Sequence, residues 1–266
     1  MFAQRTELPE FVHGDECLFC HRADIGNLWS KNRHGVTLRE RADAVDLVAK
    51  LKPPPEVTHL LGSRDHVRFL KKSGYNKFDI LEPDGKWNST KFGDRCAGCH
   101  ATAVDSKTKV FTYIGLDCYT CHGVVDLNHT NDTSLIWLSK KRRRDVQEIT
   151  TTCAQCHLRE VAKSKSTGLP YPANFVVGDD LFKDYEVDYS MLDQLNPGDR
   201  HVVRNVMDVV KNGSDVTCLS CHRVHNSSTQ KHRLVLTSAA CLDCHNAEGP
   251  KKNVKTYTVH SKLCEY

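Results

Sequence analysis

The sequence is poor in apolar residues and contains no long apolar run. Hydrophobic residues make up 39% of the 266 positions, and the mean hydropathy is −0.50. A helix that crosses a membrane needs about 20 consecutive apolar residues, and no stretch approaches that length. The first residues also lack the basic and then apolar pattern of an export signal. We therefore expect no membrane anchor, and a core to which side chains alone contribute little.

Cysteine, by contrast, is abundant, with thirteen copies. Twelve of them form six copies of the pattern Cys-x-x-Cys-His. This pattern is typical of c-type haem attachment, in which both thiols bond to the haem and the histidine binds its iron. Zinc sites and disulfides would also use cysteines, but neither explains a histidine after every pair. We therefore predict six covalently attached c-type haems.

The predicted site residues are read directly from the six motifs. The haem-attaching cysteines are Cys17, Cys20, Cys96, Cys99, Cys118, Cys121, Cys153, Cys156, Cys218, Cys221, Cys241 and Cys244. The proximal iron ligands are His21, His100, His122, His157, His222 and His245. The thirteenth cysteine, Cys264, has no partner in the pattern, so a free thiol, an intermolecular disulfide and the remainder of a seventh motif are all open.

Nine further histidines are enough to give every iron a second imidazole. Such bis-histidine ligation closes both faces of the iron and suits electron transfer. Methionine is scarce, and Met207 falls in an apolar helical stripe where packing is the favoured role. The predicted distal ligands are His13, His34, His129, His201, His225 and His260, and the predicted spare surface histidines are His59, His66 and His232. His13 and His260 lie near the termini, where ligation of a neighbouring subunit's haem is easiest, and ligation within one chain or between chains stays open.

Local patterns place some of these residues on elements. Residues 196–213 predict a helix with Asn196 as N-cap, Pro197 at its first position and Gly213 as its terminator. Its valines share one side and His201 points nearly opposite, toward a haem or water, of which we favour the haem. Residues 36–52 predict a helix that ends before a run of prolines. Residues 57–87 predict a β-hairpin insertion with a turn at 83–85.

We predict a mostly α and irregular, haem-wrapped chain with little regular sheet. Residues 1–95 carry haem 1, one helix and the hairpin, residues 96–190 carry haems 2 to 4, and residues 191–266 carry haems 5 and 6, as one continuous haem-stacked unit. The net charge is +4, but haem propionates would offset it, so nucleic acid is not indicated. The basic run 140–144 is interpreted as a solvated or propionate-pairing face, with docking of an acidic redox partner as the alternative.

The order of the motifs resembles that of multihaem cytochromes of the cytochrome c554-like and octahaem-related group. The residues that carry this resemblance cover most of the chain and are ECLFCH, NRHG, CAGCH, GLDCYTCHG, NH, CAQCH, YPANFVVGDDL, RH, DVTCLSCHRVH and CLDCH. The resemblance implies a mostly helical and irregular fold around haems in parallel-stacked and perpendicular pairs. The distal ligands that it implies, often to a haem attached elsewhere in the chain, are His34, His129, His201, His225 and His260.

Two further expectations follow from this resemblance. The second and third motifs start 22 residues apart and the fifth and sixth start 23 apart, so haems 2 and 3, and haems 5 and 6, are expected to be neighbours. Nitrite reductases of this lineage have a lysine in place of one proximal histidine, whereas all six motifs here end in histidine. This difference weakens an enzyme interpretation, although one five-coordinate haem would reopen it.

Covalent haem attachment requires export, so we expect an extracellular or cell-surface protein, or a periplasmic one if it is a soluble carrier. Glycosylation sequons exceed the number expected by chance, which favours a glycoprotein, with chance in a threonine-rich chain as the alternative. They start at Asn88, Asn128, Asn131, Asn212 and Asn226. The predicted function is electron transfer without substrate chemistry, in a self-associating extracellular filament (nanowire) subunit that exchanges electrons with redox proteins or an extracellular acceptor. The alternatives are a discrete soluble carrier and a nitrogen-oxide or hydroxylamine reductase with one open haem.

Overall fold

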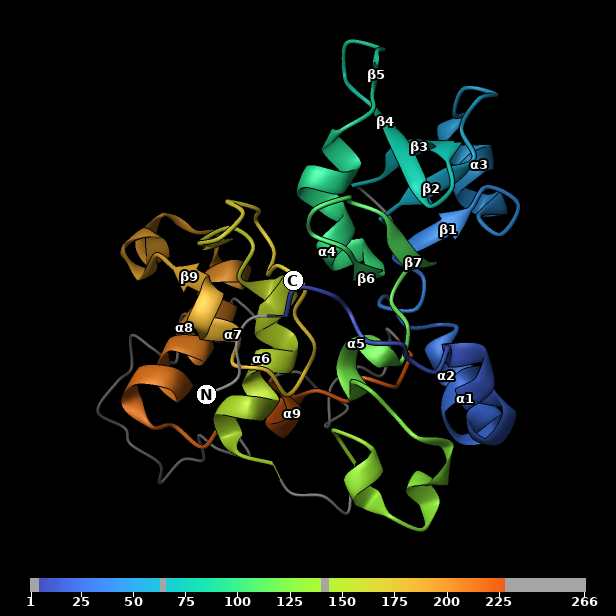
Figure 1. The fold of residues 1–266 in the computed structure, drawn as a ribbon. Helices are drawn as coiled ribbons and strands as arrows, with labels where there is room; N and C mark the ends of the chain where they lie inside the picture. Colours follow the sequence, from blue (N-terminus) through green and yellow to red (C-terminus); the bar gives the residue numbers. More distant parts are fainter. Residues whose placement is uncertain (1–4, 63–65, 140–143, 228–266) are drawn as a thin grey trace, which may run out of the picture.

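The computed structural model describes residues 5–62, 66–139 and 144–227 (Figure 1). The described part contains the first five Cys-x-x-Cys-His motifs. Several residues singled out in the sequence lie outside it: Lys140, Lys141, Arg142, Arg143, His232, Cys241, Cys244, His245, His260 and Cys264.

The fold is mostly helical and irregular with small sheets, as predicted. The α-helices are short except for two, α6 and α8. They are α1 (Gly14–His21), α2 (Asn27–Trp29), α3 (Val45–Leu51), α4 (Ala97–His100), α5 (Tyr119–His122), α6 (Val146–His157), α7 (Leu181–Asp184), α8 (Pro197–Asn212) and α9 (Cys218–Cys221). The π-helices are η1 (Arg22–Gly26) and η2 (Phe92–Cys96), and the 3-10 helices are η3 (Leu127–Thr130), η4 (Thr133–Leu135) and η5 (Tyr189–Gln194).

The largest sheet is antiparallel, has the strand order β1-β2-β3-β4-β5 and forms the lobe at the top of Figure 1. Its strands are β1 (Leu38–Glu40), β2 (His59–Leu61), β3 (Arg68–Gly74), β4 (Lys77–Leu81) and β5 (Trp87–Asn88). The predicted hairpin is therefore present as part of a wider sheet, and the predicted turn joins β4 to β5, where Gly85 has φ +82°. Two-stranded sheets pair β6 (Ala101–Val104) with β7 (Phe111–Ile114), and β8 (Ala162–Ser164) with β9 (Tyr185–Val187).

The predicted helix over residues 36–52 is correct only in its last part, since α3 covers Val45–Leu51. Its first part forms β1 instead, where Leu38 pairs with Leu61 and is buried. Burial of Leu38 against a sheet outweighs the modest helix propensity of a few residues. The end of the helix is as predicted: Lys52 adopts a left-handed conformation (φ 47°) directly before Pro53.

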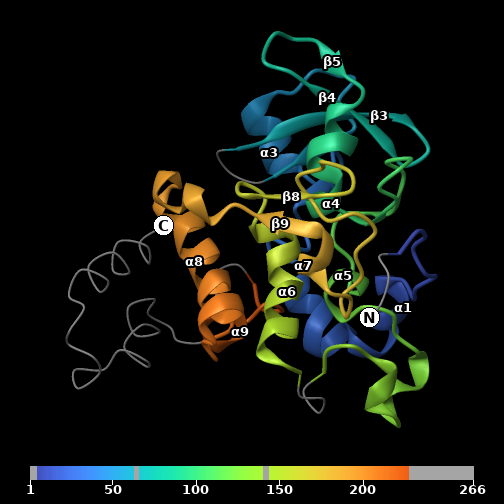
Figure 2. The ribbon, with the colours of Figure 1, turned by 60° about the vertical axis from the view of Figure 1, so that its left-hand side comes forward.

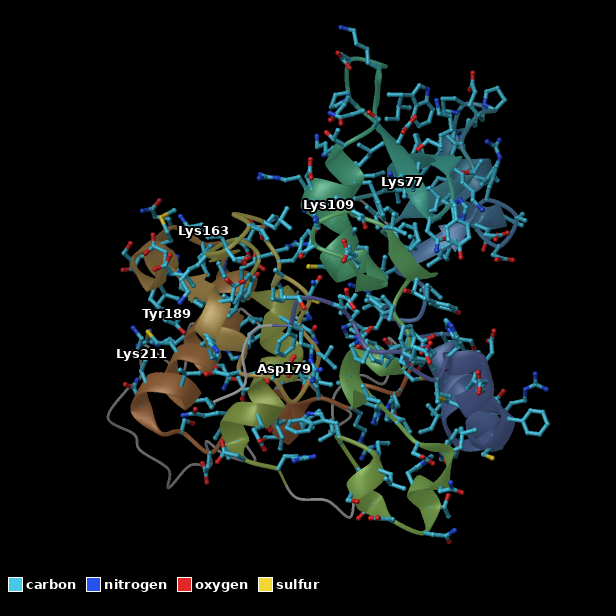
Figure 3. The ribbon with its side chains drawn as sticks, viewed as in Figure 1. Lys77, Lys109, Lys163, Asp179, Tyr189 and Lys211 are labelled. Atoms are coloured by element: carbon cyan, nitrogen blue, oxygen red, sulfur yellow. The ribbon has the colours of Figure 1, made fainter. Side chains whose placement is uncertain are left out.

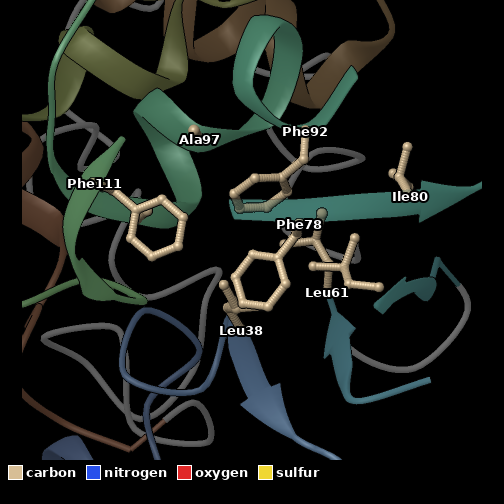
Figure 4. Packing of buried hydrophobic residues seen from close by; sticks show 9 residues of the cluster. Leu38, Leu61, Phe78, Ile80, Phe92, Ala97 and Phe111 are labelled. Atoms are coloured by element: carbon tan, nitrogen blue, oxygen red, sulfur yellow. The ribbon is translucent and has the colours of Figure 1, made fainter. Parts of the chain in front are cut away.

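One face of the large sheet packs against η2 and α4 (Figure 4). Three aromatic rings fill this interface, with centroids 5.2 Å apart for Phe78 and Phe92 and 5.7 Å for Phe78 and Phe111. Cys96, the first cysteine of the second motif, packs against the same cluster. The sheet therefore fixes the position of the second motif through ordinary apolar packing.

A second core joins α6 and α8 at the left of Figure 1. Helix α8 has the predicted ends: the Asn196 side chain accepts a hydrogen bond from the Asp199 N–H (3.1 Å), and Gly213 is left-handed. Its buried residues are Val203, Val206 and Val209, as expected from the valine stripe. Figure 2, turned by 60°, shows α8 alongside α6.

Polar and cation–π contacts also join separate parts of the chain, and Figure 3 labels three of the residues involved, Asp179, Tyr189 and Lys211. The Arg5 guanidinium pairs with Asp179 at 2.8 Å, joining segments 174 residues apart. The Lys211 ammonium lies 4.3 Å from the centre of the Tyr189 ring, between α8 and η5. Arg144, the described end of the basic run, lies 3.5 Å from the Trp137 ring and donates to the Trp137 carbonyl, so this member of the run is a packing residue. Among the described residues, no helix has the length and apolar character to span a bilayer.

The prediction that His59 is a spare surface residue is wrong, whereas His66 is exposed as predicted. His59 is only 5% exposed, and its ring meets Phe78 edge-on with centroids 4.6 Å apart. Its Nδ1 is bonded to the Thr58 hydroxyl (2.9 Å), while Nε2 is buried without a partner. Alternation along β2 puts His59 on the same side as Leu61, which faces the aromatic core.

His59 predicts a specific loss of stability in acid. Burial lowers its pKa, so the folded chain keeps the ring neutral where the unfolded chain binds a proton, and stability falls as the pH drops below about 6.5. We expect His59→Leu to gain about 1 kcal/mol at pH 7 by removing the unpaired nitrogen, and the gain to grow toward pH 5. Urea unfolding of the unaltered protein and of His59→Leu between pH 7 and pH 5 measures this difference in stability, with His66→Leu as the matched control. A gain that stays constant between pH 7 and pH 5 would contradict the prediction.

Candidate functional site

Each of the five described motifs ends on or beside a helical turn. The first motif lies in α1, the second spans η2 and α4, the third leads into α5, the fourth forms the end of α6, and the fifth forms α9 and His222. In a helix, positions i, i+3 and i+4 share one face. The two thiols and the imidazole of a Cys-x-x-Cys-His motif are therefore presented to the same side, as attachment of one planar group requires.

Helix α6 occupies the centre of this arrangement (Figure 2). Its start is stabilised by a capping box, in which Asp145 accepts from the backbone of the first turn and Glu148 accepts from the Asp145 N–H (3.1 Å). It packs against α4, α5 and α8, so the fourth motif at its end reaches three other parts of the chain.

Thiols of different motifs meet at three places. The thiols of Cys17 and Cys118, of Cys99 and Cys156, and of Cys153 and Cys218 lie close enough to shift each other's pKa. None of the ten described motif cysteines forms a disulfide. A hydrogen bond connects two further motifs: the Gln155 amide in the fourth motif donates to the Thr120 carbonyl in the third (3.0 Å). The five described motifs therefore form one connected set that branches at α6.

The structure also brings the second and third motifs together, in line with their short spacing. The hydroxyls of Thr102 and Thr120 are 3.0 Å apart, and Thr102 Oγ1 accepts from the Asp117 N–H (2.8 Å). The direct thiol contact of the second motif, however, is with the fourth motif. The expected proximity of the fifth and sixth motifs involves the sixth motif, which lies outside the described residues.

Three motif histidines each have a ring contact with a histidine from elsewhere in the chain, and we call these the facing pairs. The ring centroids are 6.2 Å apart for His21 and His129, 6.1 Å for His157 and His34, and 5.8 Å for His122 and His225. The second member of every pair is one of the six histidines proposed from the sequence as distal ligands. All three pairs join residues more than 100 positions apart in the sequence.

This spacing suits a metal ion between the two rings. With about 2 Å from metal to each nitrogen, and a little over 1 Å from nitrogen to ring centre, two imidazoles on opposite sides of one ion have centroids about 6 Å apart. Within the described residues no cluster of three or more histidine, cysteine or acidic side chains could hold a bare metal ion. The donors therefore suit a group that brings its own equatorial ligands, as haem does, better than they suit zinc.

The protonation state of these imidazoles also suits metal binding. Partial burial lowers the pKa of His34 and of His100 to about 4, and it lowers the pKa of His122 as well. A neutral imidazole can bind a metal through one nitrogen while the other is held by a hydrogen bond.

Hydrogen bonds hold the Nδ1 atoms and leave Nε2 for a ligand. His122 Nδ1 donates to the Leu138 carbonyl (2.7 Å), and His129 Nδ1 donates to the Asp126 carbonyl (2.8 Å). His100 Nδ1 lies 2.7 Å from the Thr37 hydroxyl. Thr37 was not identified from the sequence, because nothing in its surroundings signals a contact with a residue 63 positions away.

The other proposed distal ligands are placed differently. The ring contacts of His13 within the described part of the chain are with Phe11 (4.9 Å) and Tyr113 (6.2 Å), beside the third motif. His201 lies on α8 one turn before Asn205, whose side chain is 3.8 Å from the Cys218 thiol. Because i and i+4 share a helix face, His201 is placed toward the fifth motif. His260 lies outside the described residues.

Comparisons with known proteins support this architecture. No family model matches the sequence, and no curated protein matches it. The crystal structure of the outer cell wall cytochrome OcwA is similar, with a TM-score of 0.57 at 18% identity, over 91% of this chain and 68% of that one. This chain shares the fold of that cytochrome. The predicted fold class, mostly helical and irregular with little regular sheet, is confirmed.

The second motif contains a close approach that predicts the effect of a single methyl group. A Cβ atom on Gly98 would overlap the ring of Tyr171, which is buried and donates its hydroxyl to the Gly93 carbonyl. We expect Gly98→Ala to lower the free energy of unfolding by about 1–3 kcal/mol, because a buried ring must shift. The control is Gly74→Ala, where the nearest neighbour of the new atom is 3.9 Å away. Urea unfolding midpoints compare the two, and equal midpoints would rule out the close contact.

Proposed function

We propose that this protein is an electron-transfer protein that carries c-type haems on its six Cys-x-x-Cys-His motifs. The observation that carries this proposal is the set of three histidine pairs with centroids 5.8–6.2 Å apart, each made of one motif histidine and one histidine from a distant segment. A haem iron with an imidazole on each side exchanges one electron and has no position open to a substrate.

The contacts between motifs support electron transfer along the chain. In the folded protein the first motif touches the third, and the fourth touches the second and the fifth, through their thiols. The third and fourth motifs are joined by the Gln155 hydrogen bond. Haems attached at these thiols would lie edge to edge with haems of other motifs. Each of the five described motifs would then have at least one neighbouring haem.

A disulfide framework is the alternative use of the same thiols. The three contacts would give the bridges Cys17–Cys118, Cys99–Cys156 and Cys153–Cys218. That arrangement leaves one cysteine of nearly every motif unused and gives the facing histidines no role. The haem proposal accounts for both features.

We propose that the haems serve electron transfer and not catalysis on a substrate. The facing imidazoles support this at the first, third and fourth motifs. A nitrogen-oxide or hydroxylamine reductase needs one iron without a second protein ligand. Carbon monoxide binding by the unaltered protein decides between the two functions.

We further propose that the protein acts outside the cytoplasm, at the cell surface, with redox proteins or copies of itself as partners. Haem attachment to exported chains supports this location, as does the name of the similar outer cell wall cytochrome.

The paired arrangement predicts the effect of removing one distal histidine. In His129→Ala we expect the iron on the first motif to keep a single imidazole, His21, and to bind carbon monoxide in the reduced protein. Absorption spectra with and without carbon monoxide measure this, and intact mass counts the attached haems. His66→Ala, an exposed histidine, is the control and should stay unreactive. If the haem on the first motif keeps both ligands in His129→Ala, the pairing of His21 with His129 is wrong. If the unaltered chain carries no haem, the proposed function is wrong.

Self-association into a filament is tested by negative-stain electron microscopy of the haem-loaded protein. We expect long uniform filaments, and we expect His13→Ala or His260→Ala to shorten them if terminal histidines bind haems of a neighbouring subunit. Small separate particles would instead identify a discrete carrier.

A further inference from the structure

Asn32 is a buried polar residue that the proposed electron transfer does not itself use. It lies in the loop after α2 and is 4% exposed. Its side-chain amide has two donor hydrogens and one oxygen that can accept two hydrogen bonds. All four positions are occupied, and every one of them leads to a histidine of a facing pair.

The donor side of Asn32 holds the segment that carries His225. Asn32 Nδ2 donates to the Val224 carbonyl (2.9 Å) and to the Asn226 carbonyl, the residues immediately before and after His225. These bonds span more than 190 positions in the sequence. His225 is the residue that faces the motif histidine His122.

The acceptor side of Asn32 holds His34. Asn32 Oδ1 accepts from the His34 backbone N–H (2.8 Å) and from His34 Nδ1 (3.2 Å). The second bond places the imidazole proton on Nδ1 and leaves the lone pair of Nε2 for a metal. His34 is the residue that faces the motif histidine His157.

Trp29 reinforces this arrangement from the side. Its ring is nearly parallel to that of His34 (7°, centroids 6.3 Å apart) and meets His225 edge-on at 6.5 Å. The backbone of Gly35 passes so close to Trp29 that a Cβ atom there would strike the Trp29 carbonyl. One loop, residues 29–35, therefore contacts both histidines.

We infer that Asn32 is a positioning residue shared by two iron sites, those of the third and fourth motifs. This inference rests on the proposed function. Removing the amide releases two ligands at once, because the same side chain orients His34 through its oxygen and His225 through its nitrogen. A buried amide whose four positions are all satisfied has one orientation, so the two ligands are set together.

The test uses Asn32→Asp, which keeps the size of the side chain and replaces the donor nitrogen with an oxygen facing two carbonyl oxygens. We expect both irons to lose their second imidazole, so that two haems become high-spin and bind carbon monoxide while the others stay low-spin. Single variants His34→Ala and His225→Ala should each open one haem, and Asn32→Asp should match the two combined. The readouts are electron paramagnetic resonance and titration with carbon monoxide.

The matched control is Asn76→Asp. Asn76 also donates from Nδ2 to two successive backbone carbonyls, those of Phe111 and Thr112, but it lies in the sheet lobe away from the facing histidines. It should lose stability without opening any haem. This comparison separates positioning of ligands from a general loss of folding.

Each outcome decides one of the two proposals. A low-spin spectrum of the unaltered protein together with an unchanged Asn32→Asp spectrum would overturn the role of Asn32 and leave the proposed function standing. Opening of one haem only would equally overturn the shared role. Absence of haem from the unaltered protein would overturn the proposed function. If Asn32→Asp accumulates without haem, Asn32→Ala repeats the test without the added charge. If both Asn32 variants lack haem while Asn76→Asp carries the normal number, Asn32 is needed for folding and is not a positioning residue.

Discussion

The packing of α6 against its neighbours is the constraint on which the arrangement of the motifs depends. Its end carries the fourth motif, whose two thiols reach two different motifs, Cys156 toward Cys99 and Cys153 toward Cys218. Its interior residue Gln155 holds the third motif. A displacement of this helix along its axis would therefore change the separation of several motifs together. The buried valines of α8 oppose such a displacement from one side.

Burial of imidazoles is a second consequence of this packing. Removing a histidine from water disfavours its charged form, and the resulting fall in pKa keeps the half-buried His34 and His100 neutral near pH 7. A neutral imidazole whose Nδ1 is held by a carbonyl or amide oxygen keeps Nε2 free. Desolvation of these imidazoles lowers the stability of the fold in acid, but it also keeps them neutral and able to bind a metal.

Features set by adjacent residues could be predicted from the sequence, and features set by distant contacts could not. The ends of α8 depend on Asn196, Pro197 and Gly213 alone, and they were predicted. Strand β1 depends on pairing with β2, so residues 36–44 were wrongly assigned to a helix. His59 was misjudged for a related reason: alternation in its segment indicated a hairpin, but only the contact with η2 and α4 buries that face.

The residues of the candidate site divide in the same way into those set by local pattern and those set by distant contacts. The motif residues are evident because chemistry fixes their spacing. The choice of His34, His129 and His225 came from resemblance and from counting histidines, and the structure brings all three to motif histidines. Which histidine faces which motif depends on contacts across the whole chain, as the Asn32 bonds to residues 224 and 226 illustrate. No local pattern could supply those pairs.

The contacts between thiols of different motifs bear on how such a protein is made. In the folded chain Cys17 meets Cys118 and Cys153 meets Cys218, and partial burial raises the pKa of Cys121 to about 11, which suppresses the reactive thiolate. Partly buried thiols that lie against one another leave less room for a bulky reactant than the same thiols in an extended chain. On the proposed function, covalent modification is therefore easier on the still extended polypeptide than after the chain has collapsed around α6.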